Sequence, residues 1–545
     1  MSTVTIRAFL SPTLVLLAFD WPDGARRDDF LGFAIQRTPG FDGAASSWLP
    51  NRISFNGPAP NGGDLPSDGN PVQKFQWWDA RIGPADRGRH FTYRVWPVVG
   101  TPGAIQRVEE AAGELHVTLP QSVEHGIGTW FNRAVVSSQA FVREFGHEPR
   151  GAQLDAALEW LGNGLPEALR DFVGAADGSL EGAIYHLTDQ HWAIPALAAR
   201  APQTTLLAYN DTATDHTNAD VVRALTNVEF FPRTKASIMH DKLLVSVDGN
   251  GPERVLMGSA NFTTEGLTTQ ANLLHTFASP QLAALYRARA ARLRADPPVA
   301  ELAAESGWSD PIHVGDAHVR VVFSPEVSSS RASIDAVVQT VQRASSSVLF
   351  CLFDPTDTPL LDAIFAQGDA GKMMFGLVNH IPDQQPGDRA PRAEVEVFHR
   401  SREQRDVVAH GIFPRRGGPE GFWWEDADLP GGAGKFPVYI HHKFVIVDAE
   451  TDHPTIYTGS ANMSNNSLHH NDENLLEITG SPRLAHIYLA EFMRLYEHYR
   501  ARAAWERSRH HPADTFALAP DASWARKFFT AGSPEAKSRV AMAGG

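Results

Sequence analysis

The sequence predicts an α/β protein made of two similar halves, preceded by a small all-β domain. Three observations support this prediction. From about residue 125, short apolar strands alternate with helix-like segments, and this alternation runs through twice. Both runs contain the same polar residues at the same spacing. Upstream, the chain contains only short strands separated by turn-rich segments. We therefore expect domains at 1–118, 125–300 and 316–545.

The first domain is expected to be a β-sandwich. Residues 91–99 alternate apolar and polar side chains over part of their length, as a half-buried strand does. Residues 58–63, which read Pro-Ala-Pro-Asn-Gly-Gly, are typical of a loop. The length and spacing of the strands resemble those of a fibronectin type III-like module. Because such modules hold, space or bind, we expect no catalytic group here and expect the rest of the chain to work without this domain.

The two halves follow the same order of elements. Each opens on an apolar strand, at 183–187 and 348–353, and a helix-like segment follows. Each closes with a helix that begins at a Ser-Pro pair, Ser279-Pro280 and Ser481-Pro482, because serine caps a helix and proline suits its first turn. A duplication with a period near 200 residues is typical of two pseudo-symmetric domains.

Two polar motifs define the repeat. The first copy reads His240-Asp241-Lys242 and then Gly258-Ser259-Ala260-Asn261. The second copy reads His441-His442-Lys443 and then Gly459-Ser460-Ala461-Asn462. In both copies 21 residues separate the first histidine from the asparagine, and the copies lie 201 residues apart. Polar residues that recur twice at the ends of apolar strands predict one active site built from both halves.

The composition limits the expected functions. A formal net charge of −15 makes non-specific binding of nucleic acid less expected. The single cysteine, Cys351, excludes an intrachain disulfide. The sequence has no apolar run of about 18 residues, so we expect no transmembrane helix. Residues 14–19 are apolar but short and lack a cleavage site, so we expect a cytoplasmic protein unless a signal-independent route exports it.

The residue types of the motifs indicate phosphoryl chemistry. His240 and Lys242 are two residues apart on a strand, so their side chains point to the same face. The same holds for His441 and Lys443. Lysine, serine and asparagine together provide the cations and donors that a phosphoryl group requires. Two histidines beside it can provide a nucleophile and a general acid.

This constellation resembles the phospholipase D superfamily, whose mark is H-x-K-x4-D followed by G-S-x-N, present twice. The resemblance covers about residues 125–510. It implies that one histidine attacks phosphorus to form a phosphohistidine, while the other protonates the leaving alcohol and then activates water or an acceptor alcohol. It also implies chemistry without a metal or other cofactor. The residues expected to bind the phosphate are Lys242, Lys443, Ser259, Asn261, Ser460 and Asn462.

The second half matches the superfamily pattern in full. Asp448 completes its H-x-K-x4-D motif and is expected to be structural. Glu473 matches the acidic residue that orients a catalytic histidine in this superfamily. In the usual division of labour His240 is the nucleophile and His441 the acid. The complete second motif keeps the reverse assignment open.

The first half departs from the pattern at two places. Val247 occupies the position of the motif aspartate, and Asp248 comes one residue late, which puts it on the other face of a regular strand. The counterpart of Glu473 is expected at Ala271 or Gln270, neither of which is acidic. These departures leave the orientation of the first catalytic histidine without an expected partner.

The resemblance implies an enzyme that cleaves phosphodiesters. The leading hypothesis is a monomeric phosphodiesterase that releases phospholipid headgroups by hydrolysis or transphosphatidylation. The first alternative is a metal-independent nuclease or other nucleic-acid phosphodiesterase on the same scaffold. A scaffold protein that only binds phosphate is a third hypothesis. Residues 421–425, which read Gly-Phe-Trp-Trp-Glu, either pack over a domain edge or contact a membrane surface. Arg233 either contacts an anionic headgroup or lies on the surface.

Overall fold

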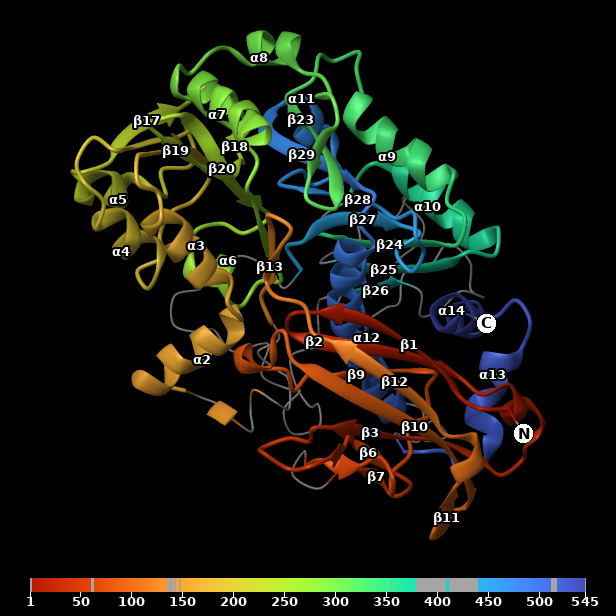
Figure 1. The fold of residues 1–545 in the computed structure, drawn as a ribbon. Coiled ribbons are helices and arrows are strands. Elements are labelled where there is room, and N and C mark those ends of the chain that lie inside the picture. The colour runs from red at the N-terminus through yellow and green to blue at the C-terminus, as the bar shows by residue number, and fades with distance from the viewer. Residues whose placement is uncertain are drawn as a thin grey trace.

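Two large sheets, one from each half of the chain, lie beside a smaller all-β region in the computed structural model (Figure 1). The structure describes residues 2–59, 63–134, 141, 144–146, 149–353, 355–378, 408–410, 440–510 and 517–544. The predicted class is confirmed, because each large sheet mixes parallel and antiparallel strands and is covered by helices.

The sheet of the first half has eight strands within the described residues, in the order β13-β14-β21-β20-β19-β15-β16-β17. These strands are β13 (Val123–Glu124), β14 (Ile127–Phe131), β15 (Ser179–Ile184), β16 (Thr205–Asn210), β17 (Glu229–Arg233), β19 (Lys242–Asp248), β20 (Gly251–Gly258) and β21 (Leu273–Phe277). Its helices are α2 (Ala152–Gly162), α3 (Leu165–Gly174), α4 (Ala193–Ala198), α5 (Ala219–Ala224), α6 (Thr264–Leu267), α7 (Pro280–Arg294) and α8 (Val299–Glu305).

The sheet of the second half repeats the central order as β29-β28-β27-β24-β25. Its strands are β22 (Ile312–Val314), β23 (Ala317–Ser324), β24 (Ser347–Leu352), β25 (Met373–Val378), β26 (Val408–His410), β27 (Lys443–Val447), β28 (Thr455–Gly459) and β29 (Asn471–Thr479). Its helices are α9 (Ala332–Gln342), α10 (Thr358–Asp369), α11 (Asn465–His469) and α12 (Pro482–His510). Both predicted Ser-Pro helix starts are confirmed: Ser279 Oγ accepts from the backbone N–H of Leu282, and Ser481 Oγ from that of Leu484.

The largest hydrophobic core lies between the two sheets. On β19, Leu243 and Val245 face this core together with α7, whereas Leu244 faces α3 and α4 on the opposite side. On β24, Leu349 and Cys351 face the same core together with α12, while the alternate residues face α9 and α10. Strands buried on both faces explain why the sequence shows continuous apolar runs there.

A short exchange of strands joins the halves at the motifs. The segment before the first motif, β18 (Ile238–Met239), pairs in parallel with Asn471 and Asp472 of the second sheet. Reciprocally, Ile440 forms a parallel bridge with Ala271 of the first half. Each motif histidine therefore lies against a strand of the other half.

The N-terminal region consists of two small antiparallel sheets that share a core. One sheet has the order β1-β2-β9, and the other contains β11-β10-β3-β4 with β12 paired to β10. Their bounds are β1 (Thr5–Ser11), β2 (Leu14–Asp20), β3 (Phe30–Thr38), β4 (Ser47–Trp48), β9 (Gln76–Asp79), β10 (His90–Thr101), β11 (Ala104–Arg107) and β12 (Gly113–Thr118). Minor elements are η1 (Pro22–Arg26), β5 (Pro50–Asn51), β6 (Ile53–Ser54), β7 (Gly57–Pro58), β8 (Leu65–Pro66), η3 (Pro84–Asp86) and η4 (Glu109–Ala111). The fibronectin type III-like resemblance stays a prediction.

The N-terminal region is packed into the rest of the molecule. Phe9, Leu14 and Leu16 belong to the same buried core as α7 and α12, and β1 and β2 lie against α12 (Figure 1). Buried Glu491 on α12 accepts a hydrogen bond of 2.8 Å from Ser11 Oγ and another from Thr13. This continuity differs from the expectation that the domain is dispensable.

The chain returns to the N-terminal sheets after α12. The returning elements are η6 (Ala522–Ala525), α13 (Arg526–Phe529) and α14 (Pro534–Ala543). Trp524 packs against Phe30 and Phe75 with ring centroids 5.0 and 5.6 Å apart, and its Nε1 donates to the carbonyl of Phe30 at 2.9 Å. Helix α14 contacts β2 and β25 and so ties the N-terminal sheets to the second half. No helix among the described residues is long and apolar enough to cross a bilayer.

The motif aspartate Asp448 organises a turn of the second half. Its carboxylate accepts hydrogen bonds of 2.7 to 3.0 Å from the backbone N–H groups of Ser345, Ser346 and Ser347. In the first half a bulge separates Ser246 from Val247, and Asp248 accepts from Asn250 within its own turn.

Replacing Asp448 with alanine is expected to lower the free energy of unfolding by about 3 kcal/mol, because the loss of a buried charged acceptor leaves several backbone donors unpaired. The matched control, Asp248→Ala, should change it by less than about 0.5 kcal/mol, as surface substitutions do. Urea unfolding of both variants measures the difference. Similar losses in the two variants would contradict the structural role of Asp448.

Candidate active site

The structure brings the two motifs together at one place between the halves. The rings of His240 and His441 lie with centroids 6.5 Å apart and planes at 72°. Each histidine is 6% exposed, so each ring edge has limited access to solvent. A phosphorus atom between two ring nitrogens at this separation is within reach of both.

Backbone contacts across the halves position each histidine. The N–H of His240 donates to the carbonyl of Asp472 at 2.9 Å, and the N–H of His441 donates to that of Ala271 at 3.0 Å. The glycine that starts each G-S-A-N turn is needed for a close approach: a Cβ on Gly459 would lie 2.3 Å from the carbonyl oxygen of Asn474. The turn therefore lies directly against the strand that carries the orienting residues.

The two imidazoles are oriented by different partners. His240 Nδ1 is 2.9 Å from Glu473 Oε2 and 3.1 Å from the carbonyl of Ser460. His441 Nδ1 is 2.9 Å from Asn272 Oδ1. All three partners are acceptors, so the proton of each neutral ring lies on Nδ1 and the Nε2 lone pair is left for chemistry.

The expected counterpart of Glu473 was wrong. It is Asn272, not Ala271 or Gln270. Asn272 follows the motif asparagine of its half by eleven residues, just as Glu473 does, and this equal spacing is the signal in the sequence that identifies it. Glu473 also orients the histidine of the other half rather than that of its own.

Glu473 is held as a carboxylate. Its Oε1 accepts from Ser467 Oγ at 2.8 Å and from Asn471 Nδ2 at 2.9 Å. Burial favours the protonated form, but the interaction with His240 and these hydrogen bonds lower the pKa of Glu473 overall. A buried carboxylate behind an imidazole stabilises positive charge on that ring.

Burial lowers the pKa of both histidines. The pKa of His240 falls to about 4, because burial and the charge of Lys242 outweigh the opposing effect of Glu473. The pKa of His441 lies well below its usual value, through burial and then the charges of Lys443 and Lys242. Both rings are therefore neutral at neutral pH in the free protein.

The motif lysines lie beside the histidines. Lys242 Nζ donates to the carbonyl of His240, and Lys443 Nζ donates to that of His441 at 2.7 Å. Burial lowers the pKa of Lys242 to about 7 and that of Lys443 well below its usual value. Bound phosphate would favour the charged form of both side chains.

An aromatic ring faces each histidine, which the sequence reasoning missed. Tyr185 packs edge-on against His240 at 5.0 Å, and Phe353 packs in the same way against His441 at 5.3 Å. Tyr185 directly follows β15 and Phe353 directly follows the corresponding strand β24, so their matched positions were a readable signal. The rings also lie 4.8 and 5.3 Å from the Nζ atoms of Lys242 and Lys443.

The G-S-A-N residues divide into two kinds. Ser259 and Ser460 are fully buried, and their Oγ atoms accept from the backbone N–H groups of Leu273 and Asn474 at 3.1 and 3.0 Å. Ser259 Oγ also donates to the Oδ1 of the orienting Asn272 at 2.8 Å. These contacts favour a supporting role for the serines. In contrast, Oδ1 of Asn261 and of Asn462 has no hydrogen-bond partner among the described residues.

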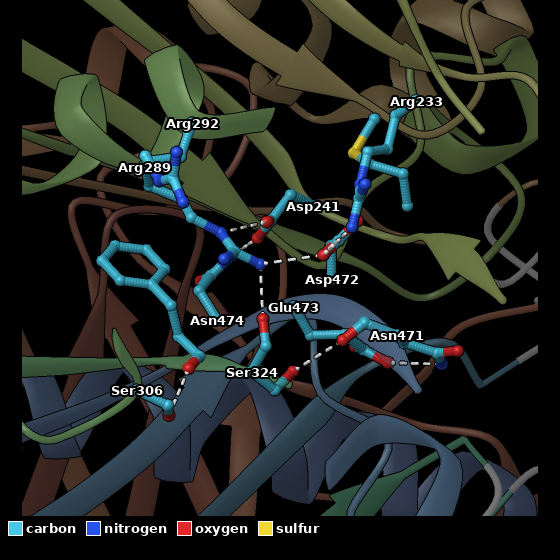
Figure 2. Close-up of polar contacts among 12 residues, drawn as sticks. Arg233, Asp241, Arg289, Arg292, Ser306, Ser324, Asn471, Asp472, Glu473 and Asn474 are labelled. Carbon is cyan, nitrogen blue, oxygen red and sulfur yellow. Dashed lines mark hydrogen bonds and ion pairs between the residues drawn. The ribbon is translucent and has the colours of Figure 1, made fainter. Parts of the chain in front are cut away.

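The residues between the motif positions, Asp241 and His442, are buried. Asp241 accepts from Asn474 Nδ2 at 2.6 Å, and His442 packs against Phe131 and Phe444. The expectations for Arg233 were wrong, because its side chain is fully buried in ion pairs (Figure 2). Residues 421–425 lie outside the described residues.

Comparison with known proteins gave one family model and several solved structures. Residues 425–496 match the family model described as cardiolipin synthase, PLD-like domain. Phosphatidylserine synthase from Haemophilus influenzae Rd KW20 aligns at 11% identity and TM-score 0.38, covering 66% of this chain and 94% of its own. Yeast tyrosyl-DNA phosphodiesterase aligns at 12% identity and TM-score 0.31, covering 58% and 86%.

A third structure, polyphosphate kinase from Porphyromonas gingivalis, aligns at 11% identity and TM-score 0.34 over 58% of this chain and 46% of its own. No curated protein sequence matches the chain. The fold and the paired motifs define an α/β protein whose candidate site is built from two similar halves. Residues 425–496 are thus similar to a PLD-like domain, and this matched segment contains the whole second motif pair.

Proposed function

We propose that the chain is a phospholipase D-type phosphodiesterase that cleaves phospholipid headgroups, by hydrolysis or transfer, through a phosphohistidine. One observation carries the proposal. His240, backed by the Glu473 carboxylate, lies opposite His441 across a ring separation of 6.5 Å, and each ring has its proton on Nδ1. This arrangement supplies a neutral nucleophile and, on the opposite side, a second ring for proton transfer.

The proposed reaction has two balanced steps. First, His240 Nε2 attacks phosphorus, the N–P bond forms and the bond from phosphorus to the alcohol oxygen breaks. His441, protonated on Nε2, gives that proton to the leaving oxygen. In the second step neutral His441 removes a proton from water or an acceptor alcohol. The oxygen of that molecule then bonds to phosphorus as the N–P bond breaks.

The unequal partners of the two histidines support this order. Attack by His240 leaves its ring positively charged, and the Glu473 carboxylate stabilises that charge. His441 has only the neutral amide of Asn272 behind it. We propose that the negative charge of the bound phosphate raises the pKa of His441, so that the ring takes up a proton from solvent before the first step. Lys242, Lys443, Asn261 and Asn462 then hold the phosphate oxygens.

The charge of the protein supports a lipid over a nucleic acid. The formal net charge is −15. Close to the site, Asp215 pairs with His186 at 2.8 Å, and the His186 ring stacks on Tyr185, which contacts His240. The Asp215 carboxylate is thus separated from the His240 ring by two side chains, and its negative charge disfavours binding of a polyanionic nucleic acid. The family model, named for a lipid synthase, points the same way.

The test is a side-by-side assay of the full chain on phosphatidylcholine vesicles and single-stranded DNA, with chelator present. We expect choline release that the chelator does not change, and no DNA cleavage. The His240→Ala variant is the blank for both substrates. DNA cleavage without choline release would instead support the nuclease alternative.

Several finer statements stay predictions. These are the domain limits 1–118, 125–300 and 316–545, a monomeric state, a cytoplasmic location and contact of 421–425 with a membrane surface. We propose the last because aromatic side chains suit the boundary between water and lipid.

A further inference from the structure

Two arginines and the carboxylates of Asp241 and Asp472 form a network of buried charges (Figure 2). Arg289, from α7, has its Nε atom 3.5 Å from Asp241 Oδ2 and its Nη2 atom 3.3 Å from Asp472 Oδ1. Nη2 also donates to the carbonyl of Ser324 at the end of β23. One guanidinium thus joins the first half to two strands of the second.

A second arginine completes the network. Arg233, at the end of β17, donates from Nε to Asp472 Oδ2 at 2.7 Å and from Nη1 to Asp296 Oδ1 at 2.8 Å. Asp472 therefore lies between two guanidinium groups. The side chains of Arg233 and Asp472 are 0% exposed and that of Arg289 is 5% exposed, so water screens these charges little.

Two carboxylates of the network adjoin the members of the His240–Glu473 pair in sequence. Asp241 follows His240 directly, and Asp472 precedes Glu473 directly. The carbonyl of Asp472 also accepts the backbone N–H of His240 at 2.9 Å. A movement of Asp241 or Asp472 would therefore also move His240 or Glu473, and it would change the distance of 2.9 Å between His240 Nδ1 and Glu473 Oε2.

The corresponding positions around His441 carry no charge. His442 stands where the first half has Asp241, and Ala271 stands where the second half has Asp472. The His442 ring packs against Phe131 and Phe444, and both of its nitrogens lack a hydrogen-bond partner among the described residues. The positions that carry aspartates next to the His240–Glu473 pair are therefore uncharged next to the His441–Asn272 pair.

We propose that Arg289 and Arg233 are positioning residues for His240: they compensate Asp241 and Asp472 and so fix the His240–Glu473 hydrogen bond without acting on His441. The kinetic part of this inference rests on the proposed function, whereas the structural part does not. The physical reason is that Asp241, Asp472 and Glu473 are three acidic groups buried close together. Without the guanidinium groups they would repel one another or take up protons.

Burial raises the pKa of Asp241 overall, and the charge of Arg289 and the hydrogen bond from Asn474 offset only part of this effect. The charged groups that shift the pKa of His240 itself are Lys242, Glu473 and Lys443. The network therefore bears on His240 through its contacts and not through the pKa of that ring.

The test uses Arg289→Lys, which keeps the charge but removes the planar fork, and Asp472→Asn, which keeps the shape but removes the charge. The matched control is Arg320→Lys. Arg320 makes two hydrogen bonds of 2.7 Å to Glu477, also on β29, and so has the same kind of forked contact away from the histidines. Each protein is made as the full chain with ¹⁵N-labelled histidine.

The first readout is the set of Nδ1 and Nε2 chemical shifts of His240 and His441 at neutral pH. Arg289→Lys and Asp472→Asn should shift the His240 signals and leave those of His441 in place, and Arg320→Lys should shift neither. The second readout is turnover of a small soluble phosphodiester. We expect kcat to fall about tenfold to a hundredfold, as for partners that orient a reacting group, with KM nearly unchanged.

Several results would overturn the inference. These are unchanged His240 signals, equal shifts of both rings, or full kcat in folded protein. If neither variant folds, the network is structural only and the inference also fails. A selective His240 shift in a chain without phosphodiesterase activity would instead uphold the positioning role and refute the proposed function, so the two failures are distinguishable.

Discussion

Replacing His240 with alanine is expected to abolish phosphodiester cleavage, with kcat lowered by at least about a thousandfold, because no other group replaces a covalent nucleophile. The loss should be the same for substrates with good and with poor leaving groups, since no N–P bond can form in either case. Steady-state assays with a nitrophenyl and an alkyl phosphodiester measure it. Residual activity within tenfold of the unmodified chain would contradict the two-histidine mechanism.

The His441→Ala variant, assayed with the same two substrates, tests the role of His441 as the general acid and base. Nitrophenolate leaves without a proton, so the first step should survive with the nitrophenyl substrate and fail with the alkyl substrate. The second step should still stop, because His441 no longer activates water. We expect a burst of about one nitrophenol per chain followed by arrest, as accumulation of a covalent intermediate predicts. Intact-mass measurement should then find a phosphorylated chain.

The opposite pattern would reverse the roles. A burst in His240→Ala and none in His441→Ala would make His441 the nucleophile, the assignment that the complete second motif left open. The structure weighs against it, because Glu473 of that motif faces His240 and not His441. Arg320→Lys, which leaves both motifs untouched, serves as the control for preparation and assay.

The sequence was sufficient to predict what local spacing determines. The duplication, the motif residues and the Ser-Pro helix starts all depend on residues close together in the chain. Asn272 could also be identified in this way, because it stands eleven residues after Asn261, as Glu473 does after Asn462. The positions expected from the sequence, Ala271 and Gln270, lie one and two residues before Asn272.

Contacts between distant segments could not be predicted in the same way. The pairing of β18 with β29 brings Glu473 next to His240. The sequence around these two residues does not indicate that the strands pair. Arg233 lies in a segment that resembles a surface turn, but its partner Asp472 is 239 residues away. A single sequence does not show which charged side chains meet in the interior.

Packing of the N-terminal region was missed for a related reason. Its strands have the pattern of an independent sandwich, and its own core is complete enough to support that interpretation. The outer face of its first sheet is nevertheless apolar too, since Phe9, Leu14 and Leu16 join the core of the two halves. A strand that is buried on both faces, as β2 is throughout, indicates a covering element.

Deletion of residues 1–118 is therefore expected to unfold the remaining chain or make it insoluble. The deletion would expose the α12 side chains that pack on Phe9, Leu14 and Leu16, at about 1.5–3 kcal/mol for each large apolar side chain returned to water. It would also leave buried Glu491 without Ser11 and Thr13. Together these losses approach the whole stability of an ordinary domain, about 5–15 kcal/mol.

Two point variants test the same contacts without deleting the domain. Trp524→Ala keeps the domain but removes the ring that joins the C-terminal segment to Phe30 and Phe75, and it should cost about 3–5 kcal/mol in urea unfolding. Ile105→Ala, on the edge strand β11, should cost far less, because Ile105 is only partly buried and lies in a small cluster away from the central core. Gel filtration and circular dichroism of the truncated chain decide the main point. A soluble, cooperatively unfolding chain of residues 119–545 that still cleaves a small phosphodiester would show that the shared core is dispensable and that the N-terminal region is a separable module after all.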